Sequence, residues 1–555
     1  MDCRTVWCGD ASLGAEHGGV FWGKIFFRKH FGMGRYFTVF ASFIGAVVGV
    51  VMVLGDWFPG YWIAAVSLPL LALGIFDLLQ TRHTLWRNYP IISHMRWLFE
   101  GIRPEIRQYL IESDGDSFPF SREQRSLVYQ RAKNQLQTIP FGTQQDVYSS
   151  GYSFFSHSLK PEHVDISTLR VRNGGDRCLQ PYSSSILNIS AMSFGSLSGN
   201  AIAALNRGAK LGSFAHDTGE GGLSRYHRQN GGDIIWEIGS GYFGCRTDDG
   251  HFDPAKFQTV AQDPQVKMIE IKLSQGAKPG HGGMLPGPKV NAEIAEARGV
   301  PEGVDCISPA SHSAFDTPMG LIAFVARLRD LSGGKPVGFK LCIGHKHEFM
   351  AIVKAMIKSD VYPDFIVIDG KEGGTGAAPV EFANSVGLPL RDGLHFANMT
   401  LIGAGIRDKI RIGASGKIVS GADMTQAMAL GADWCNSARG FMFAIGCIQA
   451  RACHTNKCPT GVATQDKMRQ AGLNVADKSV RVANFHRNTL YGFAEMIGAM
   501  GLKGPHEITF TMINFREAHF SGALLARLEP GQLLKDDCPE DYAKPWRAAN
   551  PESFR

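Results

Sequence analysis

Two long uncharged stretches stand near the start of the chain. Residues 36–55 and residues 57–76 contain no Asp, Glu, Lys or Arg. At a rise of about 1.5 Å per residue, each is roughly long enough to cross the hydrocarbon core of a bilayer as a helix. A pair of buried helices in a soluble domain is the competing interpretation, and two adjacent spans joined by a DWFPG turn disfavour it. The pattern predicts a transmembrane helical hairpin within residues 1–80.

The charges around this hairpin predict its orientation. Basic residues lie only on its outer sides, and aromatic residues cluster at the connecting turn, as at a membrane interface. The basic residues are Lys24, Arg28, Lys29, Arg35, Arg82 and Arg87, and the aromatic ones are Trp57, Tyr61 and Trp62. We expect a multi-pass protein of a bacterial inner membrane, with both ends and the catalytic domain in the cytoplasm.

Beyond the hairpin the hydrophobic pattern changes twice. Residues 81–180 are polar with periodic apolar positions, which predicts a helical adaptor. Residues 181–500 alternate short β-rich runs with stretches long enough for a helix. The eight predicted strands are 186–192, 213–218, 268–273, 305–309, 337–342, 364–369, 410–414 and 433–437. This alternation predicts an α/β protein with a (β/α)8 barrel, followed by a C-terminal extension at 501–555.

A doubly wound sheet is the rival to the barrel. It is disfavoured because no GxGxxG follows the first strand, and because glycine-rich or polar loops follow nearly every strand, where barrels build their sites. Glycines allow backbone N–H groups to approach a phosphate. The loops after strands seven and eight, at 415–417 and 437–440, are where barrel phosphate sites usually lie.

Composition narrows the class of protein. An apolar fraction of 44% and a net charge of +6 exclude a disordered chain. No basic tract or aromatic platform indicates nucleic acid, so we expect no nucleic-acid partner. The 11 cysteines do not form a secreted disulfide framework, which indicates a reducing compartment for the main body.

Three of these cysteines form a compact motif. Cys447, Cys453 and Cys458 lie in CIQARACHTNKCPTG, where they can converge on one soft metal centre. An iron–sulfur cluster is the favoured interpretation, since thiolates are its required ligands. Zinc is the alternative and would need a fourth ligand, for which His454 is sterically awkward.

Together these motifs resemble the FMN-binding synthase domain of the glutamate synthase family, in a stand-alone, membrane-anchored form. The resemblance rests on SAMSFGSLS, GEGG, QGAKPG, LPGPKV, GGTGA and the cysteine block, and covers about residues 185–500. It implies FMN and a 3Fe–4S cluster on the three cysteines as cofactors. In the family, 2-oxoglutarate and ammonia form 2-iminoglutarate, which is reduced to glutamate by hydride transfer from reduced FMN.

The resemblance also implies roles for individual residues. Lys340 matches a lysine near the flavin pyrimidine end, and Arg298 matches an arginine that grips a substrate carboxylate. The implied catalytic residues are Lys272, Gln275, Lys278, Glu220 and Arg298. The implied cofactor-binding residues are Met192, Ser193, Lys340, Gly374, Thr375, Gly416, Lys417, Ala438 and Arg439.

Three departures from the family pattern bear on which substrate the enzyme uses. His281 stands where a glutamate is usual, Met284 where a glutamine is expected to touch the substrate, and Ser415 where an aspartate usually begins the phosphate loop. Two alternatives follow: an FMN oxidoreductase acting on a different keto or imino acid, or a membrane-tethered electron-transfer protein. We expect no glutaminase domain of the family type, because Asp2 stands before Cys3 where a catalytic cysteine would follow the initiator methionine.

The expected partners follow from these departures. Ammonia would come from solution or from a glutamine amidotransferase partner. No second dinucleotide site is apparent, so a ferredoxin or a separate flavoprotein subunit is the expected electron donor, with a small keto acid as substrate.

Overall fold

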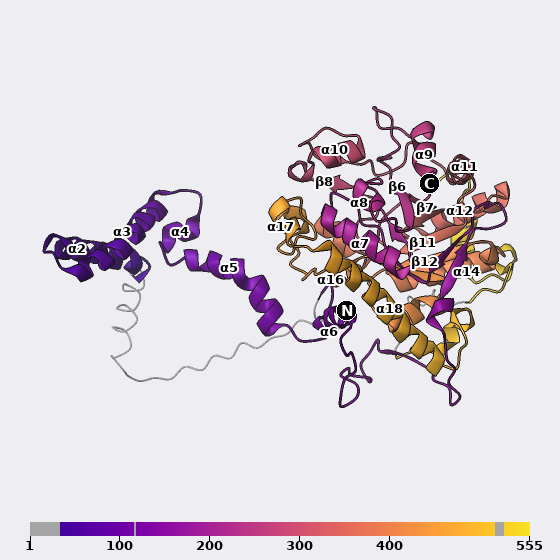
Figure 1. Cartoon of the computed structure of the whole chain (residues 1–555), viewed down its shortest axis with the longest axis horizontal. Coiled ribbons are helices and arrows are strands. Elements are labelled where there is room, and N and C mark those ends of the chain that lie inside the picture. The colour runs from indigo at the N-terminus through magenta and orange to yellow at the C-terminus, as the bar shows by residue number, and fades with distance from the viewer. Residues whose placement is uncertain (1–33, 116–117, 517–526, 555) are drawn as a thin grey trace, which may run out of the picture. The chain divides into compact units, whose positions relative to one another are not determined.

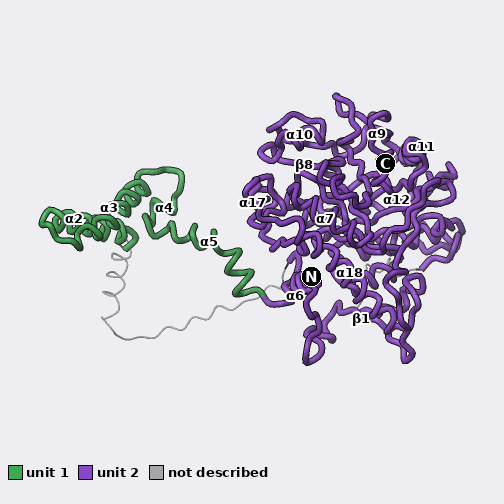
Figure 2. The backbone as a smooth tube through the Cα atoms, in the orientation of Figure 1, with its two compact units in different colours: residues 1–112 green, residues 113–555 purple. Residues whose placement is uncertain are grey.

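The chain forms two compact units in this computed structural model, which describes residues 34–115, 118–516 and 527–554. Unit 1 spans residues 1–112 and unit 2 spans residues 113–555 (Figure 2). The region predicted as an adaptor, 81–180, is divided between the two units, and the C-terminal region belongs to unit 2. The expectations that rest on Asp2, Cys3, Lys24, Arg28 and Lys29 lie outside the described residues.

Unit 1 is built on a hairpin of two apolar helices, α2 (Phe37–Leu54) and α3 (Phe58–Leu79). Small residues bring the two helices close together: a Cβ on Gly49 would lie 2.6 Å from the backbone nitrogen of Ala64. Most of the large apolar side chains of both helices are exposed. By length and composition, both helices could cross a membrane.

A buried carboxylate joins the second helix to the segment after it. Asp77, near the end of α3, is fully buried. It accepts hydrogen bonds from the backbone N–H of Ile91 at 2.9 Å and contacts Nε2 of His94, at the start of α5 (His94–Ile106), at 2.9 Å. The apolar helix pair and the polar segment after it therefore fold as one unit.

Unit 2 contains a closed parallel barrel of eight strands, in which the last strand pairs with the first. The structure thus confirms the predicted α/β class and the (β/α)8 barrel (Figure 1). The strands, in order around the barrel, are β4 (Leu187–Ile189), β5 (His216–Asp217), β6 (Ile234–Ile238), β7 (Val266–Lys272), β10 (Val337–Leu341), β11 (Phe365–Asp369), β12 (Arg411–Ser415) and β13 (Trp434–Ser437).

Helices follow the strands and cover the barrel, and polar side chains mark where several of them begin. Ser198, Asp253, Thr317 and Ser420 each accept a hydrogen bond from a backbone N–H in the first turn that would otherwise lack a partner. The main covering helices are α7 (Gly199–Gly212), α9 (Pro254–Ala261), α11 (Pro318–Leu331), α12 (Lys346–Ser359), α14 (Leu390–Gly403), α15 (Gly421–Ala429) and α18 (Val475–Ala499).

One predicted strand is wrong. Residues 305–309 do not enter the barrel: β9 (Cys306–Ile307) pairs antiparallel with β8 (Met284–Leu285) in a separate two-stranded sheet. The missing barrel strand is β6, which the sequence pattern concealed because its apolar run is interrupted by Glu237. That carboxylate is buried and pairs with Lys340 on β10, two strands away in the barrel. The charge of Glu237, which argues against a buried strand, is therefore neutralised by a residue distant in the sequence.

The segments before and after the barrel pack against it. Helix α6 (Arg122–Ala132) contacts α18 and α16 (Arg439–Ala444). The short strand β1 (Ser153–Phe155) pairs antiparallel with β14 (Ile513–Phe515), which joins the N-terminal and C-terminal parts of unit 2. The hairpin of β2 (Arg170–Asn173) and β3 (Tyr182–Ser185) leads directly into β4.

Replacing Trp236 tests the corrected strand. Its ring is fully buried and stacks on Phe257 of α9, with ring centroids 5.2 Å apart. We expect Trp236→Ala to cost about 3–5 kcal/mol through the cavity it leaves and to lower the thermal unfolding midpoint by several degrees. Met468→Ala, at an 87% exposed side chain, is the control and should leave the midpoint unchanged. An unchanged midpoint in Trp236→Ala would contradict the place of β6 in the core.

Candidate functional site

A cavity of about 1160 Å³ opens among the loops that follow the barrel strands. It brings together 16 of the 17 residues that the sequence singled out: the five implied catalytic residues, the three cysteines, and all the implied cofactor-binding residues except Gly416. Gly416 lines a small adjoining pocket with Lys417, Ala438 and Arg439. The structure therefore places the candidate residues in one site, while their individual roles remain predictions.

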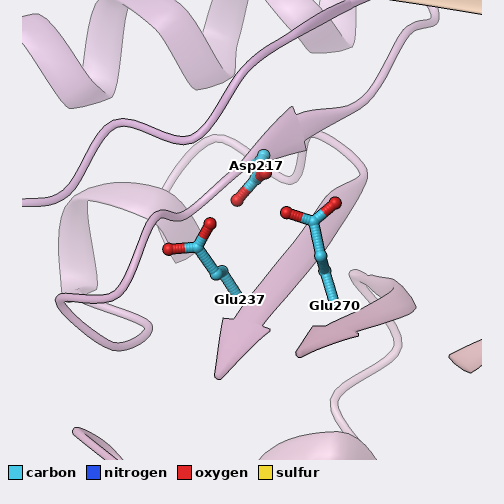
Figure 3. A group of neighbouring side chains, drawn as sticks. All are labelled: Asp217, Glu237 and Glu270. Atoms are coloured by element: carbon cyan, nitrogen blue, oxygen red, sulfur yellow. The ribbon is translucent and has the colours of Figure 1, made fainter. Parts of the chain in front are cut away.

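Lys340 and Glu237 line the floor of this cavity and belong to a buried ion cluster. The ammonium group lies 3.0 Å from Oε1 of Glu270 and 4.0 Å from Oδ2 of Asp217, and it forms a close ion pair with Glu237. All four side chains are buried. They come from β10, β7, β5 and β6, so four adjacent strands contribute to one cluster, and the three carboxylates point toward one another (Figure 3).

Burial controls how this cluster is protonated. Burial alone would lower the pKa of Lys340, but the surrounding carboxylates outweigh it and raise the pKa well above its usual value. Burial raises the pKa of Glu270 to about 7, and the charge of Glu237 adds to the rise while Lys340 opposes it. Burial, with the charge of Glu270, also raises the pKa of Asp217 well above its usual range. One ammonium among three carboxylates therefore leaves the cluster holding a proton at neutral pH.

The sequence singled out Lys340 but missed its three carboxylate partners. A lone Asp or Glu inside a β-rich run carries no signal of its own, because the partner charge lies on another strand. The close grouping of three carboxylates also resembles a metal site, since their oxygens lie within 4.8 Å of one another. The Lys340 ammonium already supplies the cation in this group, so the geometry indicates an internal ion cluster.

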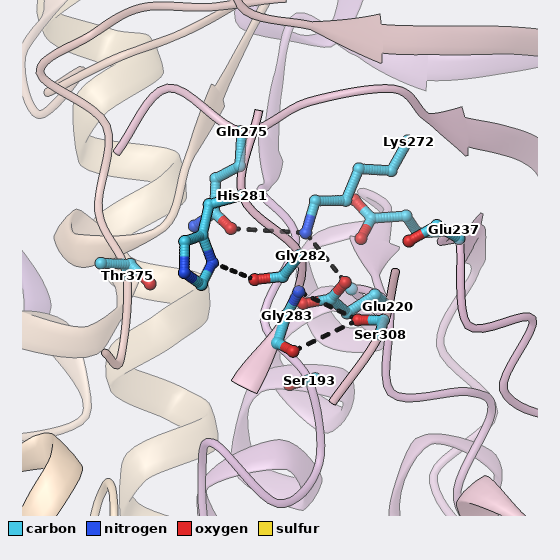
Figure 4. Close-up of polar contacts among 12 residues, drawn as sticks. Ser193, Glu220, Glu237, Lys272, Gln275, His281, Gly282, Gly283, Ser308 and Thr375 are labelled. Carbon is cyan, nitrogen blue, oxygen red and sulfur yellow. Dashed lines mark hydrogen bonds and ion pairs between the residues drawn. The ribbon is translucent and has the colours of Figure 1, made fainter. Parts of the chain in front are cut away.

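A second charged group stands above the floor. Lys272, at the end of β7, lies 3.0 Å from Oε2 of Glu220 and 3.4 Å from Oε1 of Gln275 (Figure 4). Burial would raise the pKa of Glu220, but the charges of Lys272, Lys278 and Arg298 outweigh it and lower the pKa to about 2. Glu220 is therefore ionised at neutral pH and surrounded by three cations.

The Gln275 loop, which follows β7, is held by the end of β11 and the loop that follows it. The side-chain amide of Gln275 donates to the carbonyl of Gly374 at 2.6 Å, and the N–H of Gly276 donates to Asp369 at 2.7 Å. A Cβ on Gly276 would lie 1.8 Å from the carbonyl oxygen of Gly370, so only glycine fits there. Close packing of two loops requires this glycine.

Arg298 reaches the cavity from outside the barrel. It ends helix α10 (Ala292–Arg298), which lies with β8 and β9 in the excursion between β7 and β10. Its side chain is buried and donates to the carbonyl of Phe194 at 3.1 Å, while its guanidinium stacks over the ring of Phe243 at 5.1 Å. Part of its hydrogen-bonding fork is thus engaged in holding the loop after β4.

The three residues that depart from the family pattern differ in whether they line the cavity. Met284 lines the cavity, whereas His281 contacts the carbonyl of Gly282 through Nδ1 at 2.7 Å and packs edge-on against Phe382 (Figure 4). Ser415, at the end of β12, is buried with its hydroxyl 3.3 Å from that of Ser190. Of the three, only Met284 and Ser415 line the cavity.

The cysteine loop forms one wall of the same cavity, and a lysine that the sequence did not single out supports it. Lys289 is buried and donates to the carbonyls of Ser196 at 3.0 Å and Cys453 at 3.3 Å. Burial lowers the pKa of Lys289 to about 8. Its position in LPGPKV was part of a motif, but its contact with the cysteine loop depends on the fold.

Glu270→Gln tests the ion cluster. Because the folded pKa of Glu270 is raised to about 7, the folded protein keeps a proton that the unfolded chain releases above its ordinary pKa of 4.5. Stability should therefore fall as pH rises from about 4.5 to about 7. The variant lacks this group, so its thermal midpoint relative to wild type should increase between pH 5 and pH 8. A difference that is constant with pH would contradict the raised pKa.

Known proteins resemble this chain over most of its length. The sequence model described as "Conserved region in glutamate synthase" matches residues 179–503. A glutamate synthase large subunit-like protein, YerD of Bacillus subtilis, is 36% identical over 543 residues, which cover 90% of this chain and 98% of that protein. An archaeal-type glutamate synthase [NADPH] of Thermotoga neapolitana is 37% identical over 314 residues, 56% of this chain and 58% of that protein.

Among solved structures, the flavin-binding domain of baker's yeast flavocytochrome b2 aligns with a TM-score of 0.40 and 12% identity, over 75% of this chain and 84% of that one. A likeness this distant carries no argument about function. The family model alone spans more than half of the chain, and YerD matches nearly all of it. The matched region contains all eight strands of the barrel. These matches establish that the chain is an oxidoreductase of the glutamate synthase family.

Proposed function

We propose that this chain is an FMN- and iron–sulfur-dependent glutamate synthase that converts 2-oxoglutarate and ammonia to glutamate through 2-iminoglutarate. One observation carries the proposal. A single cavity is lined by the glycine loops after β11 and β12, by a cluster of three cations around Glu220, and by all three cysteines. A phosphate-bearing flavin, an acidic substrate and a cluster would thus share one site.

The end of the cavity that adjoins the small pocket of Gly416, Lys417 and Arg439 suits an anion such as the flavin phosphate. We call it the phosphate end. Lys417, in the loop after β12, and Arg439, at the start of α16, line the small pocket at this end, and the guanidinium of Arg439 donates to the carbonyl of Glu372. Gly416 has a φ of +159° and adjoins both cations. When bound, FMN would supply the two electrons that reduce an imine. The residues that would hold it are Met192, Ser193, Lys340, Gly374, Thr375, Gly416, Lys417, Ala438 and Arg439.

The charges of the substrate region suit an acid with two carboxylates. Lys272, Lys278 and Arg298 provide three positive charges around the single negative charge of Glu220. Lys278 is buried, and burial lowers its pKa, so a carboxylate that reaches it would be favoured. A dianion such as 2-oxoglutarate would neutralise the two excess charges. In this arrangement Lys278 and Arg298 bind the substrate, while Lys272, Glu220 and Gln275 orient it.

A second candidate substrate class follows from Met284. Its apolar side chain lines the same cavity as Lys278, where a hydrogen-bonding group would help to select a polar substrate. An acid whose remote end is less polar than that of 2-oxoglutarate would fit this wall better. The same cations and the same flavin chemistry would then act on a different keto or imino acid.

The setting of the cysteines supports an iron–sulfur cluster. All three line the same cavity as the candidate flavin-binding residues, where a cluster could pass electrons to a flavin. Thiolates are the ligands that iron–sulfur clusters require. The N–H of Gln449 also lies 3.5 Å from the sulfur of Cys447 and donates to it, as is common around clusters.

The proposal also covers the membrane anchor, the electron donor and the source of ammonia. The α2–α3 hairpin would anchor the chain in a bacterial inner membrane, with the barrel in the cytoplasm; only 17% of the apolar window of each helix is buried. A ferredoxin or a separate flavoprotein subunit would deliver electrons through the cluster. Ammonia would come from solution or from a glutamine amidotransferase partner.

Reoxidation of the reduced flavin tests the reaction. The full chain, purified anaerobically in detergent and reduced, should be reoxidised by 2-oxoglutarate with ammonium, as followed by the return of the flavin absorbance. Lys278→Met and Arg298→Lys should each weaken the apparent affinity for the acid at least about tenfold, because a buried cation or a bidentate fork is lost. Lys467→Met, at an exposed lysine, is the matched control. Reoxidation by another keto acid alone would favour the second substrate class.

Replacing one cysteine tests the cluster. Cys453→Ser should remove the paramagnetic signal of the oxidised protein and lower its iron content, while most of the FMN stays bound. Cys538→Ser, near α19 (Glu540–Ala548), is the control and should keep both the signal and the iron. Stoichiometric zinc without iron in the anaerobically purified protein would refute the cluster.

A further inference from the structure

The residues just before helix α6 reach the phosphate end of the cavity, although they precede the barrel by more than 60 residues. Phe118 and Pro119 line the main cavity, and Phe120 lines the small pocket that also holds Gly416 and Arg439. Phe120 is fully buried, whereas Phe118 is 80% exposed. The sequence placed this segment only in the predicted helical adaptor, because it shares no motif with the glycine loops it meets.

The two phenylalanines contact the two cations of this pocket. The guanidinium of Arg439 lies 4.7 Å from the ring centroid of Phe120, and the ammonium of Lys417 lies 5.2 Å from that of Phe118. Each cation is therefore held by an aromatic face, a contact worth about 0.5–2 kcal/mol. Burial lowers the pKa of Lys417, and it lowers that of Arg439 to about 10, so both cations would gain from a bound anion.

The same segment is hydrogen-bonded to the cysteine loop. Gln449, between Cys447 and Cys453, accepts from the N–H of Phe120 at 3.2 Å and donates to the carbonyl of Phe120 at 3.1 Å. Tyr129, on α6, donates its hydroxyl to the carbonyl of Cys447 at 2.7 Å. A single stretch of chain thus joins the pocket of the two cations to the loop of the three cysteines.

We propose that Phe118, Pro119 and Phe120 complete the binding site for the phosphate group of the flavin, as a wall supplied from outside the barrel. The inference rests on the proposed flavin site and adds residues to it. The two rings hold Lys417 and Arg439 at this end of the pocket, and the buried ring of Phe120 excludes water from its side. The paired hydrogen bonds to Gln449 fix the wall against the cysteine loop, so retention of the flavin phosphate depends on a segment that the barrel itself does not contain.

Comparing FMN with riboflavin tests this wall, because riboflavin has the same ring system without the phosphate. In the full chain in detergent, Phe118→Ala should release FMN at least about tenfold faster than wild type, as followed by the rise of flavin fluorescence on dilution. The exposed ring contributes little to the core, so this variant should fold. Phe120→Leu keeps the apolar volume but removes the aromatic face, and should also weaken FMN. Riboflavin binding to the flavin-free protein should change little in either variant.

The controls separate this inference from the proposed function. Phe141→Ala removes a fully exposed ring from the same region and should bind FMN as wild type does. If wild type binds no FMN, the proposed function fails and this inference fails with it. If wild type binds FMN but both wall variants retain it equally well, only the wall is overturned. Equal losses of FMN and riboflavin would also overturn it, because the wall would then act on the ring system or on the fold.

Discussion

The interior of the barrel depends on one buried ammonium, that of Lys340, and on the three carboxylates of Asp217, Glu237 and Glu270 that enclose it. Charges buried at this depth are tolerated only when they are paired, and removing one partner of a buried pair typically costs about 3–5 kcal/mol. Because the four residues come from four adjacent strands, the cluster constrains the register of β5, β6, β7 and β10 together. It also makes the floor of the cavity a charged surface that retains a proton.

Charge is separated within the cavity along its depth. The floor has more carboxylates than cations, whereas the region above it gathers Lys272, Lys278 and Arg298 around the single carboxylate of Glu220. Lys417 and Arg439 form a second positive region at the end lined by the loops after β12 and β13. Anionic groups are thus favoured at two separate places in one cavity, and the proposed enzyme would use one for the phosphate of its flavin and the other for its substrate.

The walls of the cavity come from segments that lie far apart in the sequence. Strand loops supply the glycines, an excursion between β7 and β10 supplies Arg298 and Met284, a loop after β13 supplies the cysteines, and residues 118–120 close one end. Strands of the barrel hold the ion cluster around Lys340, while Arg298 and Met284 both stand on the excursion. Selectivity for the acid can therefore change at Met284 without disturbing the ion cluster or the flavin end.

The sequence by itself determined the α/β alternation, seven of the eight barrel strands, the apolar hairpin and the residues that gather in the cavity, because periodicity, glycine loops and the cysteine spacing are local signals. It could not determine what depends on contacts between distant segments. Glu237 concealed β6, since its neutralising partner lies on β10, and the carboxylates around Lys340 carry no signal singly. Residues 118–120 meet Lys417, Arg439 and Gln449 only because α6 packs on α16 and α18. Tertiary structure alone decided these features, because a buried charge or an aromatic wall is defined by its partners rather than by its neighbours along the chain.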